Sequence, residues 1–174
     1  MANRQSLKEL QERLARRLTA ARTEAATVSW LAVEAGNHRF LLPLVQSGEI
    51  FPWSSVQAVP YTKTWYLGVA NLRGGLNGVI DLAGLVTGQP SSADRVTSES
   101  RLVSLHSALG VNAVLWIDRL LGLRNPSSFS SVGERPADAP AYVTRVLFDA
   151  QGLAWQELDL QQLAGEPEFL AIAA

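Results

Sequence analysis

The chain opens with hydrophobic positions in a helical rhythm. Within residues 6–26, leucines recur at steps of three and four positions, and no glycine or proline interrupts before Gly36. Ser6 with Glu9 forms a capping box, which marks the start of a helix. The pattern therefore predicts a helix over residues 6–26 with a narrow apolar face. The leucines of that face are Leu7, Leu10, Leu14 and Leu18.

Two roles fit this helix, packing on its own domain or binding a partner. Residues 1–26 carry six Lys and Arg against three Glu, so strong charge flanks the thin leucine face. We favour packing on the domain, and the partner-binding role stays open.

From Val28 onward the hydrophobic positions fall into short strand-like segments. Gly36-Asn37 is a plausible hairpin turn between strands 28–35 and 38–45. Gly74-Gly75 suits the tight turn of a second hairpin, between strands 68–73 and 76–81. The other strands predicted are 47–52, 56–60, 102–106, 111–121, 141–149 and 152–155, and short helical segments are predicted at 82–87 and 158–163.

Polar segments divide this β-rich region. Residues 89–100 are polar and predict a hinge between two halves, and the Ser- and Pro-rich stretch 124–140 predicts a long loop. We therefore expect a helical extension (1–27), a two-lobed domain (28–165, hinge near 88–100) and a tail (166–174). Many short strands with few helices favour a mainly β fold of small barrels over an α/β sheet.

The amino-acid composition limits the classes of function that the protein can have. The 174 residues are 47% hydrophobic and 18% charged with a net charge of −1, which fits an ordinary globular domain and gives no overall case for nucleic acid or an anionic membrane. The absence of cysteine excludes disulfides, thiolate catalysis and Cys-based zinc sites. No apolar run approaches the roughly 18 residues of a membrane span. After Arg145 the chain carries five acids and no base.

Catalytic patterns are weak. Ser104, His106 and Asp118 could form a triad only by assembly from distant positions, since no GxSxG elbow places the serine. The five tryptophans lack interleaved basic residues, which favours packing over base stacking. We therefore expect no enzyme activity, metal or cofactor. A small hydrolase and a barrel that binds single-stranded nucleic acid remain as weaker alternatives.

One arginine stands out. Arg73 lies in the apolar stretch 65–82, where it is either an edge residue with its head in water or an interface anchor. Glu49 has the same two readings. If the fold brings the two together, they form either a structural salt bridge or the polar part of a docking site.

The stretches PLVQSGEI (43–50) and GVANLRGGLNGVIDL (68–82) resemble the CheW family of chemotaxis coupling proteins. The later NAVLWIDRLLGLRNPSSF (112–129) is similar to the second-lobe strand of that family. The N-terminal helix and the ending after Glu166 look more like the PilI branch, the coupling proteins of type IV pilus (twitching motility) systems, than the flagellar branch.

The resemblance implies a mainly β fold of two intertwined five-stranded SH3-like barrels with a groove between them. It implies a non-catalytic adaptor, without a cofactor, that holds the cytoplasmic tip of a methyl-accepting chemotaxis receptor and the CheW-like regulatory domain of a CheA-type histidine kinase. Such a protein binds no nucleic acid, does not insert into the membrane, and is cytoplasmic and recruited to membrane-associated receptor arrays. A flagellar chemotaxis coupling protein is the alternative.

The resemblance also implies a partner-binding site. Its receptor-facing groove corresponds to Glu49 and Arg73, and the other positions implied are Asn71, Leu72, Leu120 and Leu121. Ser47 departs from the apolar residue common two positions before the glutamate, which makes the groove more polar. Lys63 and Asn77-Gly78 depart from proline-containing steps and soften the neighbouring turns.

Overall fold

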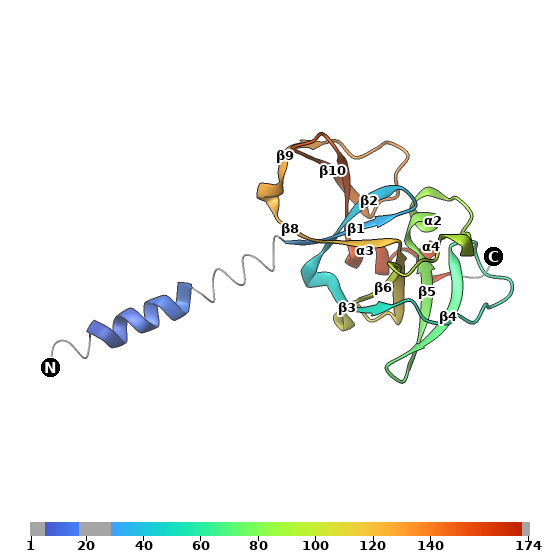
Figure 1. Ribbon diagram of the computed structural model, residues 1–174, viewed down its shortest axis with the longest axis horizontal. Helices are drawn as coiled ribbons and strands as arrows, with labels where there is room; N and C mark the ends of the chain where they lie inside the picture. Colours follow the sequence, from blue (N-terminus) through green and yellow to red (C-terminus); the bar gives the residue numbers. More distant parts are fainter. Residues whose placement is uncertain (1–5, 18–28, 172–174) are drawn as a thin grey trace.

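The computed structural model describes residues 6–17 and 29–171, and it is mainly β (Figure 1). A helix over residues 6–17 precedes the strands. The strands are β1 (Trp30–Ala35), β2 (His38–Pro43), β3 (Ser47–Pro52), β4 (Tyr66–Leu72), β5 (Gly75–Asp81), β6 (Arg101–Leu105), β7 (Ala113–Ile117), β8 (Arg119–Arg124), β9 (Phe129–Gly133), β10 (Val143–Asp149) and β11 (Ala154–Leu158). The short helices are α2 (Leu82–Thr87), α3 (Leu160–Ala164) and α4 (Pro167–Leu170), and the 3-10 turns are η1 (Leu44–Gln46), η2 (Ala93–Arg95), η3 (Ser107–Leu109) and η4 (Pro126–Ser128).

The strands form two sheets, and the chain passes from the first sheet to the second and back again. Sheet A has the order β8-β1-β2-β11-β10-β9, and sheet B has the order β3-β6-β7-β5-β4. Sheet A therefore takes strands from both ends of the β region, whereas sheet B takes the middle. This confirms the mainly β, two-lobed fold, although sheet A has six strands where five were expected.

The chain passes between the sheets at η1 and again at Asp118, between β7 and β8. The single strand predicted over 111–121 is therefore wrong. Asp118 interrupts the apolar run because its backbone N–H donates to Glu34 (2.8 Å) and its carboxylate accepts from the Gly36 N–H (2.8 Å). These contacts turn the chain from the buried β7 into the more exposed β8.

Two polar segments differ from their predictions. Residues 88–100 connect α2 to β6, and both neighbouring strands, β5 and β6, belong to sheet B, so this segment is not a hinge between lobes. The long loop predicted over 124–140 contains η4 and β9, a serine-containing strand at the edge of sheet A. Its polarity reflects exposure rather than absence of structure.

Sheet B is closed by a bridge between its edge strand β4 and the segment after β3. Gln57 and Val69 exchange backbone hydrogen bonds of 2.8 and 2.9 Å. Gly68 makes this approach possible, since its φ is +141° and an added Cβ would lie 2.0 Å from the Gln57 carbonyl oxygen. The strand predicted at 56–60 is reduced to this one bridge.

The largest hydrophobic cluster joins the two sheets. Phe40 of sheet A, Leu115 of sheet B and Leu163 of α3 all belong to it and are fully buried. A shared core of this kind makes the two lobes one folding unit.

The leucine face of helix 6–17 is not buried. Leu7, Leu10 and Leu14 are 59%, 51% and 51% exposed, so the preference for packing on the domain is wrong for these three residues. Leu18 and the rest of the predicted helix, residues 18–26, lie outside the described residues. Within the described ranges, we find no helix with the length and apolar character needed to cross a membrane.

Candidate functional surface

Strands β4 and β5 form a hairpin (Figure 1). Arg73 lies at its turn, between Leu72 and Gly75. Leu72 pairs with Gly75, so the turn is formed by Arg73-Gly74 and not by Gly74-Gly75 as predicted. Both turn residues have positive φ, +52° for Arg73 and +75° for Gly74. Such values are routine for glycine but uncommon for arginine, and they cost on the order of 1 kcal/mol.

Arg73 forms an ion pair with Glu49. Its Nη1 lies 2.9 Å from Glu49 Oε1, and the two side chains are 74% and 50% exposed. Glu49 lies on β3 and Arg73 follows β4, the two edge strands of sheet B. An ion pair this exposed contributes at most about 1 kcal/mol to stability, so it mainly orients the two charges.

A pocket of about 400 Å³ lies beside this pair, and Glu49 and Arg73 both line it; we call it the Arg73 pocket. Ser104 also lines it and accepts a 2.7 Å hydrogen bond from the Glu49 N–H, which fixes the backbone of β3 there. Two partly exposed apolar side chains, Phe51 and Val111, line the same pocket. Charges that are oriented beside exposed apolar groups are typical of a protein-binding surface.

The other predicted site residues have different positions. Asn71 is exposed on β4 and pairs with Leu76 across the hairpin, whereas Leu72 is only 8% exposed and belongs to a hydrophobic cluster of sheet B. Leu120 (40% exposed) and Leu121 lie on β8 of sheet A, and neither lines the Arg73 pocket. The fold thus unites Glu49 and Arg73 in one pocket that lacks the two leucines.

The hydrolase alternative gains no geometric support from its three residues. Ser104 Oγ accepts from Glu49, His106 Nδ1 accepts from the Ala108 N–H (3.1 Å), and Asp118 is bound to Arg95. The described part of the chain also contains no group of three or more His, Cys, Asp or Glu that could hold a metal ion.

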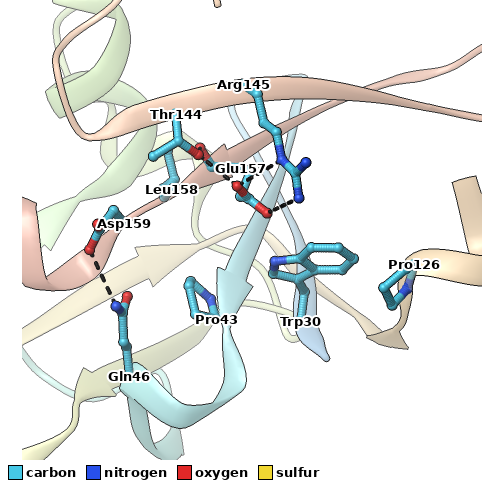
Figure 2. A pocket seen from close by; sticks show the side chains of 9 residues that line it. All are labelled: Trp30, Pro43, Gln46, Pro126, Thr144, Arg145, Glu157, Leu158 and Asp159. Carbon is cyan, nitrogen blue, oxygen red and sulfur yellow. Dashed lines mark hydrogen bonds and ion pairs between the residues drawn. The ribbon is translucent and has the colours of Figure 1, made fainter. Parts of the chain in front are cut away.

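A second pocket, of about 290 Å³, lies on sheet A between Trp30, Pro126 and the β10–β11 pair (Figure 2). Its polar groups are bound to one another. Arg145 donates to Glu157 at 3.1 and 3.3 Å, and Gln46 donates to Asp159 at 3.2 Å. Because these charges are already satisfied, the pocket is better explained as structural than as a ligand site.

The role of Arg95 was not predicted from the sequence. Its guanidinium donates to both oxygens of the fully buried Asp81 (3.0 and 2.9 Å) and to Asp118 (3.0 Å). It also lies over the Trp116 ring, 4.2 Å from the centroid. Burial lowers the Arg95 pKa, but the hydrogen bonds and charges of Asp81 and Asp118 outweigh that effect and raise the pKa. An aspartate inside the apolar run VIDL was the available signal, because a buried carboxylate needs a cation.

Comparisons with known proteins agree with this fold. The family model described as CheW-like domain matches residues 29–168. Protein PilI of Pseudomonas aeruginosa is 30% identical over 113 residues, which cover 65% of this chain and 61% of that protein. The match thus spans less than two thirds of the length of this relative.

A solved structure shows the same fold. The crystal structure of the scaffolding protein TtCheW from Thermoanaerobacter tengcongensis superposes with a TM-score of 0.63 at 18% identity, and covers 77% of this chain and 85% of that chain. With the family match over most of its length, the chain belongs to the CheW family.

Proposed function

We propose that this protein is a non-catalytic adaptor that couples methyl-accepting chemoreceptors to a CheA-type histidine kinase. The observation that carries the proposal is the exposed Glu49–Arg73 pair, 2.9 Å apart, in one pocket with the partly exposed apolar side chains of Phe51 and Val111. Membership of the CheW family supports an adaptor role for this surface.

Apolar and charged side chains contribute to binding in different ways. Exposed apolar groups supply affinity when a partner covers them, and an arginine oriented by a carboxylate supplies directional hydrogen bonds. Arg73 keeps an unfavourable backbone conformation in a turn where glycine or asparagine is preferred. Such local strain supports a functional reason for the arginine.

The pathway we propose is control of type IV pilus twitching motility. The support is the similarity to the relative named Protein PilI. In this role the protein works in the cytoplasm and joins receptor arrays at the membrane through its partners. A role in flagellar chemotaxis is the alternative, and binding to pilus-type and flagellar-type receptor tips, measured side by side, separates the two.

The test is a binding titration of the full-length protein with a receptor-tip fragment and, separately, with the regulatory domain of the kinase. Arg73→Glu should weaken at least one of the two interactions about 30-fold or more, as for an interface hot spot. Arg135→Glu, at another exposed arginine, is the matched control and should bind like the wild type. Wild-type affinity of a folded Arg73→Glu variant for both partners would contradict the proposal.

The charge-swapped pair sharpens this test. If Glu49 and Arg73 only stabilise each other, the double variant Glu49→Arg/Arg73→Glu should regain binding. If each contacts the partner, as we propose, the double variant should bind no better than the single variants.

A further inference from the structure

Two charged features of the chain have no part in the proposed function. Helix 6–17 is basic, with four Lys and Arg against two Glu, whereas the chain after Arg145 carries five acids and no base. We propose that helix 6–17 of one copy docks into a pocket beside α4 of a second copy, so that the protein self-associates head to tail.

The helix is built for such a contact. A helix of about 12 residues is marginal alone in water, so a partner that covers its apolar face stabilises it. Leu10 and Leu14 are each 51% exposed. Arg13 follows Leu10 by three positions and Arg17 follows Leu14 by three, which places both arginines beside the leucine face.

The receiving site is a cavity of about 290 Å³, which we call the α4 pocket. Its walls combine aromatic and acidic side chains, and Phe169 of α4 stacks on Trp65 with the ring centroids 6.2 Å apart. Leu170, next to Phe169, is 59% exposed and extends the apolar surface. Its lining includes Trp65, Leu85, Tyr142, Glu166, Glu168 and Phe169.

The α4 pocket carries negative charge, which complements the basic helix. Neither Glu166 nor Glu168 forms an ion pair with a residue in the described part of the chain. Burial, and then the negative charges of these two glutamates, raise the pKa of the Tyr142 phenol well above its ordinary value. Aromatic walls beside these two glutamates fit a helix that presents leucines bordered by arginines.

The position of the pocket favours a second copy over the chain's own helix. The described domain starts at Ser29, next to the beginning of β1. At the other end of β1, a Cβ on Gly36 would lie 2.6 Å from Ala83 of α2, the helix that supplies Leu85 to the pocket. The chain's own helix would have to run back along β1, whereas the helix of another copy meets no such constraint.

A head-to-tail contact leaves a free helix at one end and a free pocket at the other, so larger species form as concentration rises. One short helix in a cavity of about 290 Å³ makes a small contact, so we expect weak, reversible association.

Sedimentation velocity of the full-length protein over a concentration series tests the proposal without receptor or kinase. We expect the average mass to rise with concentration. The leucine variant (Leu10→Ser/Leu14→Ser) and the glutamate variant (Glu166→Lys/Glu168→Lys) should each weaken association about tenfold or more. Val132→Ser, which changes a 61% exposed residue on β9, is the control and should associate like the wild type.

Mixing the two variants identifies the occupant. The glutamate variant keeps a native helix and the leucine variant keeps a native pocket, so an equal mixture should form dimers and nothing larger. A wild type that stays monomeric at every concentration would overturn the proposal. A mixture that stays monomeric would do the same, since it would mean that each helix closes on its own chain or binds elsewhere.

Discussion

Arg73 reaches Glu49, 2.9 Å away, from a turn position with a φ of +52°. The pair joins the two edge strands of sheet B, but its side chains are too exposed for it to stabilise the fold much. Arg73 should therefore contribute little to folding stability, so its proposed role in partner binding can be tested separately.

Arg73→Asn tests that separation. Asparagine adopts positive φ more readily than arginine, and the relief of turn strain should offset the lost ion pair. We expect a free energy of unfolding within about 1 kcal/mol of the wild type, measured by urea denaturation, together with weaker binding of the receptor or kinase. A variant that loses much more stability than this would show that the pair is structural.

The Arg95 network should be far more important for stability. Arg95→Met removes the only cation within hydrogen-bond distance of the buried Asp81 among the described residues, at an expected cost of about 3–5 kcal/mol in urea denaturation. Arg119→Met is the matched control, since its ion pairs with Glu34 and Glu99 are more exposed, and it should cost less than about 1 kcal/mol. Equal losses in the two variants would contradict this account of Arg95.

Gly68 should be irreplaceable where sheet B closes. An alanine there places Cβ against the Gln57 carbonyl at a φ of +141°, so Gly68→Ala should lower the free energy of unfolding by more than about 2 kcal/mol. Gly75→Ala, in the same hairpin, meets its nearest atom at 3.6 Å and should change stability by less than about 1 kcal/mol. Thermal denaturation of both variants provides the comparison, and a tolerated Gly68→Ala would refute the closure.

Asp149 should make the free energy of unfolding depend on pH in the acid range. The hydrogen bond from Trp155 Nε1 (3.1 Å) and those from the Leu153 and Gln151 N–H groups lower the pKa of its carboxyl group. A lowered folded-state pKa stabilises the protein above the ordinary value of about 3.9, and this contribution disappears as the pH falls through the folded-state pKa.

The wild type should therefore lose more stability than Asp149→Asn between about pH 6 and about pH 3, as measured by denaturant titration at each pH. Asp138→Asn, at an exposed loop carboxylate, should keep the wild-type dependence. Identical pH profiles for the wild type and Asp149→Asn would contradict the assignment.

Local chemistry was enough to predict some elements. The turn at Gly36-Asn37 is confirmed, since Ala35 pairs with His38 and both turn residues have positive φ. Strand β3 and helix α2 have the predicted bounds, and Pro52 and Gly88 mark their C-terminal ends. These features depend on residues that are neighbours in the sequence.

The errors come from contacts between residues that are distant in the sequence. Asp118 divides an apolar run because Glu34, Gly36 and Arg95 bind it, and none of these is near it in the sequence. The strand β9 forms because it pairs with β10, although its own residues have little strand character. Such partners are not visible in a local pattern.

The candidate surface also combines residues that the sequence pointed to with a contact that it could not show. Glu49 and Arg73 were each singled out from the sequence, but their contact depends on how sheet B brings its edge strands together. Leu120 and Leu121 were added from the family resemblance, and their role in partner binding remains a prediction.

The most direct test of the account is a bridging experiment. A receptor-tip fragment is immobilised, and recovery of the kinase regulatory domain is measured with increasing amounts of this protein. We predict that kinase recovery requires the wild-type protein, is unchanged with Arg135→Glu and is strongly reduced with Arg73→Glu. Kinase recovery that is independent of the protein, or equal with the wild type and a folded Arg73→Glu variant, would contradict the claim that this chain couples the two through the surface at Arg73.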